Sequence, residues 1–236
     1  MTEPLVFLPP MLCDMRVFRA QMQAFGAERP VTFAPVHGAE RIEEIASDLI
    51  AALPARFALV GAGFGGMVAL ELLRRVPDRL ARLALIATSP LPVTPLEASE
   101  REPMIIAARM GRMDDVLALE LPKRALAPSE RRAEILDLVR DMAHGLGAEA
   151  YMAQGRALQR RRNQLPVLQK MRQPLMIVGG AEDGIYPVKR QDFLKEMVPD
   201  ARLEIVAGAG HLPTLEQPRY MVDLLRAWLR QPMILR

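Results

Sequence analysis

Short apolar runs alternate with amphipathic segments over much of this 236-residue chain. Apolar runs of four to eight residues are typical of buried strands, and apolar residues spaced three or four apart are typical of helices that bury one face. The runs that predict strands lie at 5–8, 31–36, 57–60, 83–87, 174–178 and 202–206. Helical spacing follows most of them, at 14–25, 42–53, 67–76, 188–198 and 214–229. This alternation predicts an α/β fold, a mostly parallel, doubly wound sheet with helices on both faces.

The alternation stops at Pro90 and does not resume until about Gln173. No convincing strand is visible between them. Helical spacing recurs at 104–112, 114–121, 129–144 and 148–162, separated by prolines and glycines. We therefore expect residues 90–173 to form a helical cap, inserted before the last two strand–helix units of a single domain that spans 1–236.

Composition narrows the class of protein. Half of the residues are apolar, and Lys plus Arg exceed Asp plus Glu by only 31 to 28, so a basic surface for nucleic acid is not expected. The only cysteine, Cys13, fits a reducing compartment. There is no signal-like N-terminus and no membrane-length apolar run, and the three histidines are too few and too scattered to predict a metal cluster. We expect a soluble cytoplasmic monomer or homodimer that takes a small molecule and needs neither membrane nor cofactor.

A glycine-rich turn follows the predicted strand at 57–60. Glycines stand at positions 61, 63, 65 and 66, and helical spacing begins at Met67. Such a turn aims backbone N–H groups at whatever lies above the sheet. It matches the dinucleotide fingerprint G-x-G-x-x-G through Gly61, Gly63 and Gly66. It also matches the nucleophile elbow G-x-S-x-G, with Gly63 in the serine position.

Two features argue against the dinucleotide interpretation. The fingerprint expects an acidic residue about 20 positions later, at the end of the next strand, to hold a ribose. That strand ends in Ala87, Thr88 and Ser89. The fingerprint also normally opens the first strand–helix unit of its sheet, whereas two such units precede it here.

The elbow interpretation requires an acid and then a histidine, each in a loop that follows a later strand. Asp183 lies just beyond the strand predicted at 174–178, and His211 lies in a glycine-rich loop after the strand at 202–206. An aspartate in a turn is usually a cap, and a single histidine is usually structural. Their chain order, the elbow and the helical insertion together favour the catalytic interpretation.

The chain resembles the α/β-hydrolase family, in particular its compact, cofactor-free esterases and haloperoxidase-like enzymes. The resemblance covers nearly the whole length and rests on three segments: Gly61-Ala-Gly-Phe-Gly-Gly66, Gly180-Ala-Glu-Asp183 and Gly208-Ala-Gly-His211. It implies that His211 is the general base and that Asp183 orients it. It also implies an oxyanion hole from the backbone N–H groups of Phe64 and Met11, with Leu12 as the next candidate.

The departure from the family lies at Gly63, because glycine has no side chain that could attack a substrate and the acyl-enzyme route is closed. Pro10 also stands where the family usually has glycine. Three explanations stay open: a serine-to-glycine variant of an active hydrolase, a homologue that only binds a small molecule, or an enzyme that works with the His211–Asp183 pair alone.

Other residues offer no obvious replacement for the missing serine. Cys13 is near the proposed oxyanion loop, but nothing nearby is expected to activate its thiol, and a packed apolar role is favoured. Thr88 and Ser89 end a strand where the family places no nucleophile. We therefore expect hydrolysis of a small, apolar ester or related carbonyl compound, with a non-catalytic, ligand-binding pseudo-hydrolase as the alternative.

The cap is expected to set the substrate. Methionines and a tyrosine on its helices would give a flexible, apolar lining, although they could equally pack the cap on the sheet. The substrate-contacting residues proposed on this basis are Leu12, Met104, Met142 and Tyr151.

Overall fold

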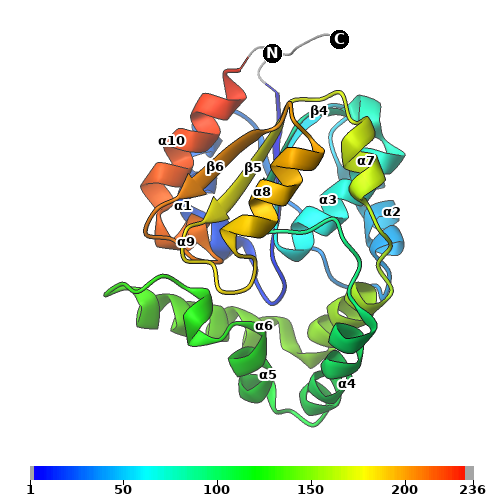
Figure 1. Cartoon of the computed structure of the whole chain (residues 1–236), viewed down its shortest axis with the longest axis vertical. Coiled ribbons are helices and arrows are strands. Elements are labelled where there is room, and N and C mark those ends of the chain that lie inside the picture. Colours follow the sequence, from blue (N-terminus) through cyan, green and yellow to red (C-terminus); the bar gives the residue numbers. More distant parts are fainter. Residues whose placement is uncertain (1–2, 232–236) are drawn as a thin grey trace.

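The computed structural model describes residues 3–231; residues 1–2 and 232–236 of the expected domain lie outside the described part. Its centre is a six-stranded, fully parallel sheet with the strand order β2-β1-β3-β4-β5-β6 (Figure 1). The strands are β1 (Leu5–Leu8), β2 (Val31–Phe33), β3 (Phe57–Ala62), β4 (Leu80–Ile86), β5 (Leu175–Gly180) and β6 (Arg202–Val206). Each lies at or overlaps a predicted apolar run.

Burial follows the position of each strand in the sheet. Every residue of β1, β3, β4 and β5 is buried, because helices cover both faces of the central strands. The edge strands β2 and β6 are mostly half-buried, which suits their more mixed sequences.

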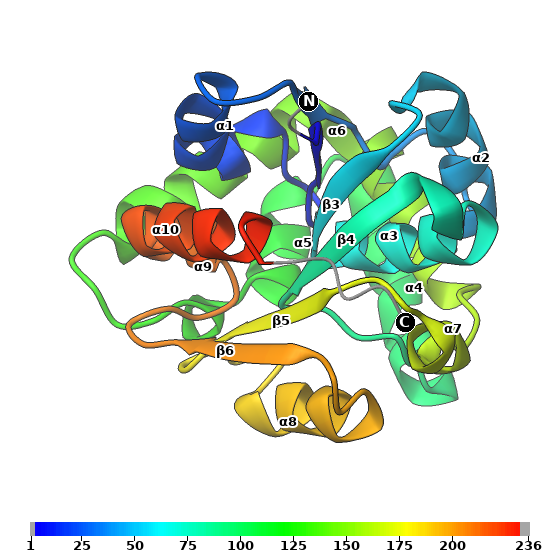
Figure 2. The same cartoon turned by 90° about the horizontal axis from the view of Figure 1, so that it is seen from above.

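Helices cover both faces of the sheet (Figure 2). One face carries α1 (Arg19–Gly26) and α10 (Pro218–Leu229), whose side chains share a core with Ala58 and Val60. The other face carries α2 (Ile42–Ala52), α3 (Phe64–Arg75), α7 (Leu165–Lys170) and α8 (Val188–Met197). The expected doubly wound α/β fold is confirmed.

Three helices form a separate layer across the carboxyl ends of the strands (Figure 1). They are α4 (Pro95–Arg109), α5 (Met113–Glu120) and α6 (Arg132–Gln159), which is kinked at Gly147, where φ is 80°. The segment 90–173 also contains α7, which packs against α3 on the sheet rather than in this layer. We refer to α4, α5 and α6 as the cap.

The start of the cap differs from the expected helix at 104–112. Helix α4 begins at Pro95 because Thr94 and Glu97 form a capping box, and it continues through Pro103. The short 3-10 turns are η1 (Met15–Phe18), η2 (Pro77–Arg79) and η3 (Lys123–Ala125), and α9 (Pro213–Glu216) precedes α10.

The strand order reverses between β1 and β3, because β2 extends the sheet on one side and β4 on the other. In open α/β sheets, ligands bind outside the carboxyl ends of the strands at such a switch point. The loops that follow β1 and β3 therefore meet under the cap. No helix within the described range 3–231 is long and apolar enough to cross a membrane.

Candidate active site

The turn between β3 and α3 holds Gly63 in a conformation that side chains disfavour, with φ 50° and ψ −118°. Its N–H donates to the carbonyl of Ile86 at 2.9 Å, and its carbonyl accepts the Thr88 hydroxyl at 2.6 Å. A Cβ atom on Gly65 would lie 2.3 Å from the carbonyl oxygen of Leu8, so only glycine fits there. The glycines thus let helix α3 start directly against β1.

Pro10 occupies part of the space that a side chain at position 63 would need. A Cβ atom on Gly63 would lie 2.9 Å from the Cβ of Pro10 and 3.9 Å from Nε2 of His211. The first distance is too short for two carbon atoms, and the proline ring is rigid. Nε2 of His211 therefore faces the space directly above Gly63.

Asp183 and His211 form a buried pair. The Nδ1 atom of His211 lies 3.0 Å from Oδ2 of Asp183, and the carboxylate is fully buried. Oδ1 of Asp183 also accepts the backbone N–H groups of Ile185 at 2.8 Å and Tyr186 at 2.9 Å. Burial alone would raise the pKa of Asp183, but these hydrogen bonds and the interaction with His211 outweigh it and lower the pKa.

This arrangement defines what the imidazole can do. With Asp183 ionised, Nδ1 of His211 carries the hydrogen that it donates, so Nε2 of a neutral ring is left as an acceptor that faces Gly63. Such a nitrogen can take a proton from a molecule in that space.

Met11 and Phe64 follow β1 and β3 and line the cavity described below. Among residues 3–231, no protein group accepts a hydrogen bond from the backbone N–H of either residue. The N–H of Leu12, the second candidate at this loop, instead donates to Oε1 of Gln154 at 3.2 Å. Free N–H groups of this kind can stabilise an oxyanion.

Gln154 was not anticipated from the sequence. It is buried in the cap helix α6, and its Nε2 donates to the carbonyl of Val36 at 3.1 Å while its oxygen accepts from Leu12. Leu12 has a positive φ of 59°, which is unfavourable for a leucine. The glutamine therefore stabilises the strained loop that carries Met11.

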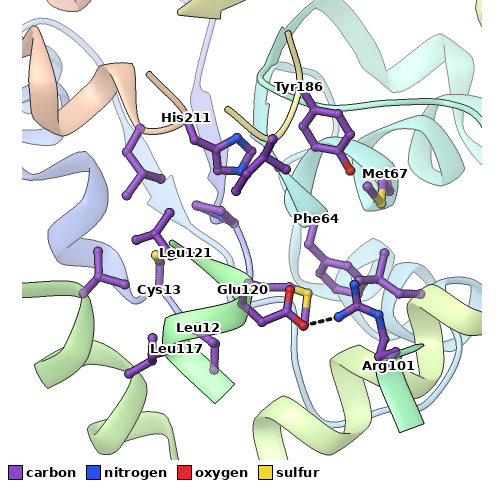
Figure 3. Close-up of a pocket in the computed structure, with 17 residues that line it drawn as sticks. Leu12, Cys13, Phe64, Met67, Arg101, Leu117, Glu120, Leu121, Tyr186 and His211 are labelled. Atoms are coloured by element: carbon purple, nitrogen blue, oxygen red, sulfur yellow. Dashed lines mark hydrogen bonds and ion pairs between the residues drawn. The ribbon is translucent and has the colours of Figure 1, made fainter. Parts of the chain in front are cut away.

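A cavity of about 120 Å³ lies between the cap and these loops (Figure 3). Its lining is mostly apolar and includes Met11, Leu12, Phe64, Met67, Leu117 and Leu121. The polar side chains in the lining are His211, Tyr186, Arg101 and Glu120. In Figure 3 the ion-paired Arg101 and Glu120 lie across the cavity from His211.

Comparison with known proteins identifies the family. A model of the alpha/beta hydrolase family matches residues 12–224. A pimeloyl-[acyl-carrier protein] methyl ester esterase from Aromatoleum aromaticum is 32% identical over 206 residues, which cover 80% of this chain and 80% of that protein. The chain belongs to the α/β hydrolase family. This assignment confirms the family resemblance expected from the sequence. The esterases among its relatives identify the chain as a carboxylesterase-like hydrolase.

Two further similarities define the extent of this family relation. The bifunctional protein BioHC of Teredinibacter turnerae is 26% identical over 236 residues, and the chain spans only 41% of its length. An esterase from Thermogutta terrifontis superposes with a TM-score of 0.87 at 23% identity, covering 98% of this chain and 90% of that one. The similarity to the Thermogutta terrifontis esterase shows a shared fold.

Within this α/β hydrolase, three of the residues expected to contact substrate do not line the cavity. Met142 and Tyr151 are fully buried in the cap, and Met104 packs partly buried against the same core. Tyr151 instead contacts residues of the cavity wall: its hydroxyl donates to Glu120 at 2.7 Å and also interacts with Arg101. The sequence left a lining role and a packing role equally open for these side chains, because helical spacing does not show which face of a cap helix meets the cavity. Leu12, by contrast, does line it.

The side chains considered as replacement nucleophiles have other roles. Cys13 lines the cavity but is buried, and burial followed by the charge of Asp14 raises the pKa of its thiol, so it stays protonated. The Thr88 hydroxyl donates to Gly63, and the oxygen of Ser89 accepts the N–H of Leu91 at 3.3 Å. Over residues 3–231 no group of three His, Cys, Asp or Glu side chains could hold a metal ion.

Glu216 holds the loop that carries His211 against the segment that leads into α6. Its Oε1 accepts the N–H groups of Ala127 at 2.7 Å and Gly210 at 2.9 Å, and its Oε2 accepts that of Leu212 at 2.9 Å. Burial raises the pKa of Glu216, although these three hydrogen bonds oppose the shift. We call this set of contacts the Glu216 clamp.

The backbone adds to the Glu216 clamp. The N–H of His211 donates to the carbonyl of Ala125 at 2.8 Å, and a Cβ atom on Gly210 would lie 2.2 Å from that oxygen. A Cβ atom on Gly184 would similarly lie 2.4 Å from the carbonyl oxygen of Arg124. The loops of Asp183 and His211 therefore both pack on the segment 124–127. The sequence offered one signal for this contact, the glycines beside both residues.

Proposed function

We propose that this protein hydrolyses a small ester with the His211–Asp183 pair alone, by activating a water molecule above Gly63. The observation that carries the proposal is the position of His211 Nε2, which faces the space over a residue without a side chain. The unpaired N–H groups of Met11 and Phe64 border the same cavity. A base, room for its water and oxyanion donors are the groups that direct hydrolysis requires.

The proposed reaction forms no covalent bond between the protein and the substrate. Nε2 of His211 takes a proton from water while the water oxygen bonds to the ester carbonyl carbon. The carbonyl oxygen becomes an oxyanion that accepts from the N–H groups of Met11 and Phe64. When the carbon–oxygen bond to the alcohol breaks, His211 returns the proton to the leaving oxygen, and the products are an acid and an alcohol.

The packing of Pro10 supports a site adapted to glycine. A serine at position 63 would bring its Cβ within 2.9 Å of the proline ring, so an otherwise identical serine-bearing chain would have to shift this loop. This contact argues against a simple serine-to-glycine change in an active hydrolase. Retention of the buried acid–base pair argues against a protein that only binds.

The substrate class is inferred from the cavity and the relatives. An apolar lining suits an apolar acyl group, and about 120 Å³ accommodates only the part of the substrate near the ester. The curated relative from Aromatoleum aromaticum is named for the methyl ester of a carrier-bound acyl chain. We therefore propose a methyl ester, or an ester of another small alcohol, as the first class to test.

The test compares turnover of methyl butyrate and p-nitrophenyl butyrate by the unmodified protein, His211→Ala and His144→Ala. His144 is an exposed histidine of the cap that contacts Asp114 at 3.1 Å, so its loss controls for the general effect of removing an imidazole. We expect turnover to fall about 100-fold in His211→Ala and to stay unchanged in His144→Ala.

The alternative function, a pseudo-hydrolase that only binds a small molecule, predicts a different result. It requires that the unmodified protein turn over no ester above the rate of His211→Ala. Equal rates for these two proteins would overturn the proposed hydrolysis.

A further inference from the structure

The cavity wall opposite His211 is polar, in contrast to the rest of the lining (Figure 3). Arg101 and Glu120 form an ion pair there, with 15% and 16% of their side chains exposed. The Tyr151 hydroxyl also donates to Glu120, at 2.7 Å. The Nε atom of Arg101 is buried and has no hydrogen-bond partner within residues 3–231. Glu120 and Tyr151 both interact with this guanidinium, and its Nε is left without a partner.

A second cation, the half-buried Arg161, lies near Arg101. Arg161, just beyond α6, directs Nη1 at the sulfur of Met67 at 2.6 Å and interacts with Tyr186, and both of these residues line the cavity. Its Nε is also buried without a partner, and in the described part of the chain it makes no ion pair with a carboxylate. A thioether sulfur is a weak acceptor for a guanidinium.

Neighbouring charge leaves this region positive. Burial lowers the pKa of Arg161 and the nearby charge of Arg101 adds to that effect, whereas Glu97 and Tyr186 oppose it. The exposed Arg190 adds a third guanidinium, whose Cζ lies 5.5 Å from the centre of the Tyr186 ring. Within this group only Glu120 supplies a carboxylate in direct contact.

A charged N–H group that is removed from water normally has a partner, because desolvation is unfavourable unless an opposite charge or a hydrogen bond replaces the water. The Nε atoms of Arg101 and Arg161 lack such a partner among the described residues. We propose that Arg101, Arg161 and Arg190, grouped around Tyr186, form an anion subsite that binds a carboxylate or phosphate group of the substrate. The ring of Tyr186 lies 5.6 Å from that of His211, so the anion would sit on the same substrate molecule as the reacting ester. The subsite's role in binding a substrate rests on the proposed esterase function, but its test measures anion binding and does not depend on turnover.

Binding measured by titration calorimetry tests the subsite without any turnover. The probes are glutarate, dimethyl glutarate and inorganic phosphate, each titrated into the unmodified protein. We expect saturable binding of glutarate or phosphate and none of the neutral diester at the same concentration. The anion that binds more tightly shows whether the subsite prefers a carboxylate or a phosphate group. Binding of neither anion, or equal binding of the diester, would contradict the proposal.

Three variants locate the binding. Arg161→Met should weaken the anion about 10-fold or more, the range of a hydrogen bond to a charged group. Arg162→Met is the matched control, since Arg162 is the next residue, its side chain is 80% exposed and it contacts Glu43 at 3.4 Å. Glu120→Gln should instead strengthen binding several-fold, because it removes the carboxylate that competes for Arg101.

Whether Glu120→Gln binds the anion more tightly or more weakly than the unmodified protein distinguishes an anion subsite from an ion pair that only stabilises the fold. A structural ion pair predicts that this variant binds the anion no better, and often worse, than the unmodified protein. Weaker binding in Glu120→Gln, or no loss in Arg161→Met, would overturn the subsite. If these anions bind as expected but no ester is hydrolysed, the subsite stands and the proposed function fails.

Discussion

The two halves of the site differ in what they retain. On the base side, the buried Asp183 is hydrogen-bonded to His211, and the Glu216 clamp holds the loop that carries His211. On the nucleophile side, Gly63 has no side chain and Pro10 occupies part of the space. A site that had lost all function would be under no physical requirement to keep one half intact. The contrast supports the proposal that His211 acts as a base on water, which is the attacking group in the proposed reaction.

The largest expected effect comes from rebuilding the nucleophile side. Gly63→Ser together with Pro10→Gly should raise esterase turnover about 1,000-fold, because it supplies a hydroxyl and the space for it. Gly63→Ser alone should gain far less, since its Cβ would meet Pro10 at 2.9 Å. Turnover of p-nitrophenyl butyrate measures both.

The matched control for this rebuilding is Gly63→Ala with Pro10→Gly, which adds a Cβ without a hydroxyl. It should show no gain. Equal activity of Gly63→Ser with and without the change at Pro10 would show that the proline is not what excludes a side chain from this position.

The next effect comes from the base side. Asp183→Asn should lower turnover about 100-fold while the protein stays folded, because an amide can donate to Nδ1 and so favour the wrong tautomer of His211. The pH dependence of turnover gives the measurement. A rate unchanged by Asp183→Asn would show that the pair has no catalytic role.

A smaller effect should follow from loosening the Glu216 clamp. Glu216→Gln replaces one acceptor oxygen with an amide, so one of the three N–H groups loses its partner. We expect kcat to fall about 10-fold with little change in KM, because the clamp positions His211 and does not contact the substrate. The free energy of unfolding should fall by about 1 kcal/mol.

Glu28→Gln is the control for the Glu216 clamp, since Glu28 also accepts a hydrogen bond, that of the Arg226 guanidinium at 2.8 Å, but on the surface between α1 and α10. It should leave kcat unchanged. A fall in kcat that merely follows the loss of folded protein would argue for a purely structural role of Glu216.

The smallest effect concerns stability and pH. Because the pKa of Asp183 is lowered from 3.8 in the folded protein, its ionised form stabilises the fold at pH values above about 3.8. That contribution is lost as the pH falls through the folded pKa. The difference in unfolding free energy between the unmodified protein and Asp183→Asn should therefore shrink in urea titrations from about pH 7 to about pH 3. A constant difference would contradict the lowered pKa.

Much of the fold followed from the sequence, because apolar periodicity reports burial directly. The six strands and the helical layer between β4 and β5 were each visible in that pattern. Thr94 and Glu97 show where more could have been predicted, since their capping box marks the true start of α4. The helix expected from the sequence began at residue 104, whereas α4 runs through Pro103.

The site was only partly predictable. Chain order brought out Asp183 and His211, because a family motif fixes the order of those residues. Gln154 gave no such signal, since its partner Leu12 lies 142 positions away and the hydrogen bond exists only once the cap is folded. The contact of Pro10 with position 63 is likewise a result of tertiary packing.

In the proposed reaction, water rather than a residue of the protein attacks the ester. Rapid-mixing kinetics with p-nitrophenyl butyrate, followed by the intact mass of the quenched protein, test it most directly. The unmodified protein should turn over with no initial burst of p-nitrophenol and no acyl adduct, whereas Gly63→Ser with Pro10→Gly should show both. A burst with an acyl adduct on the unmodified protein, at Cys13 or elsewhere, would contradict the claim.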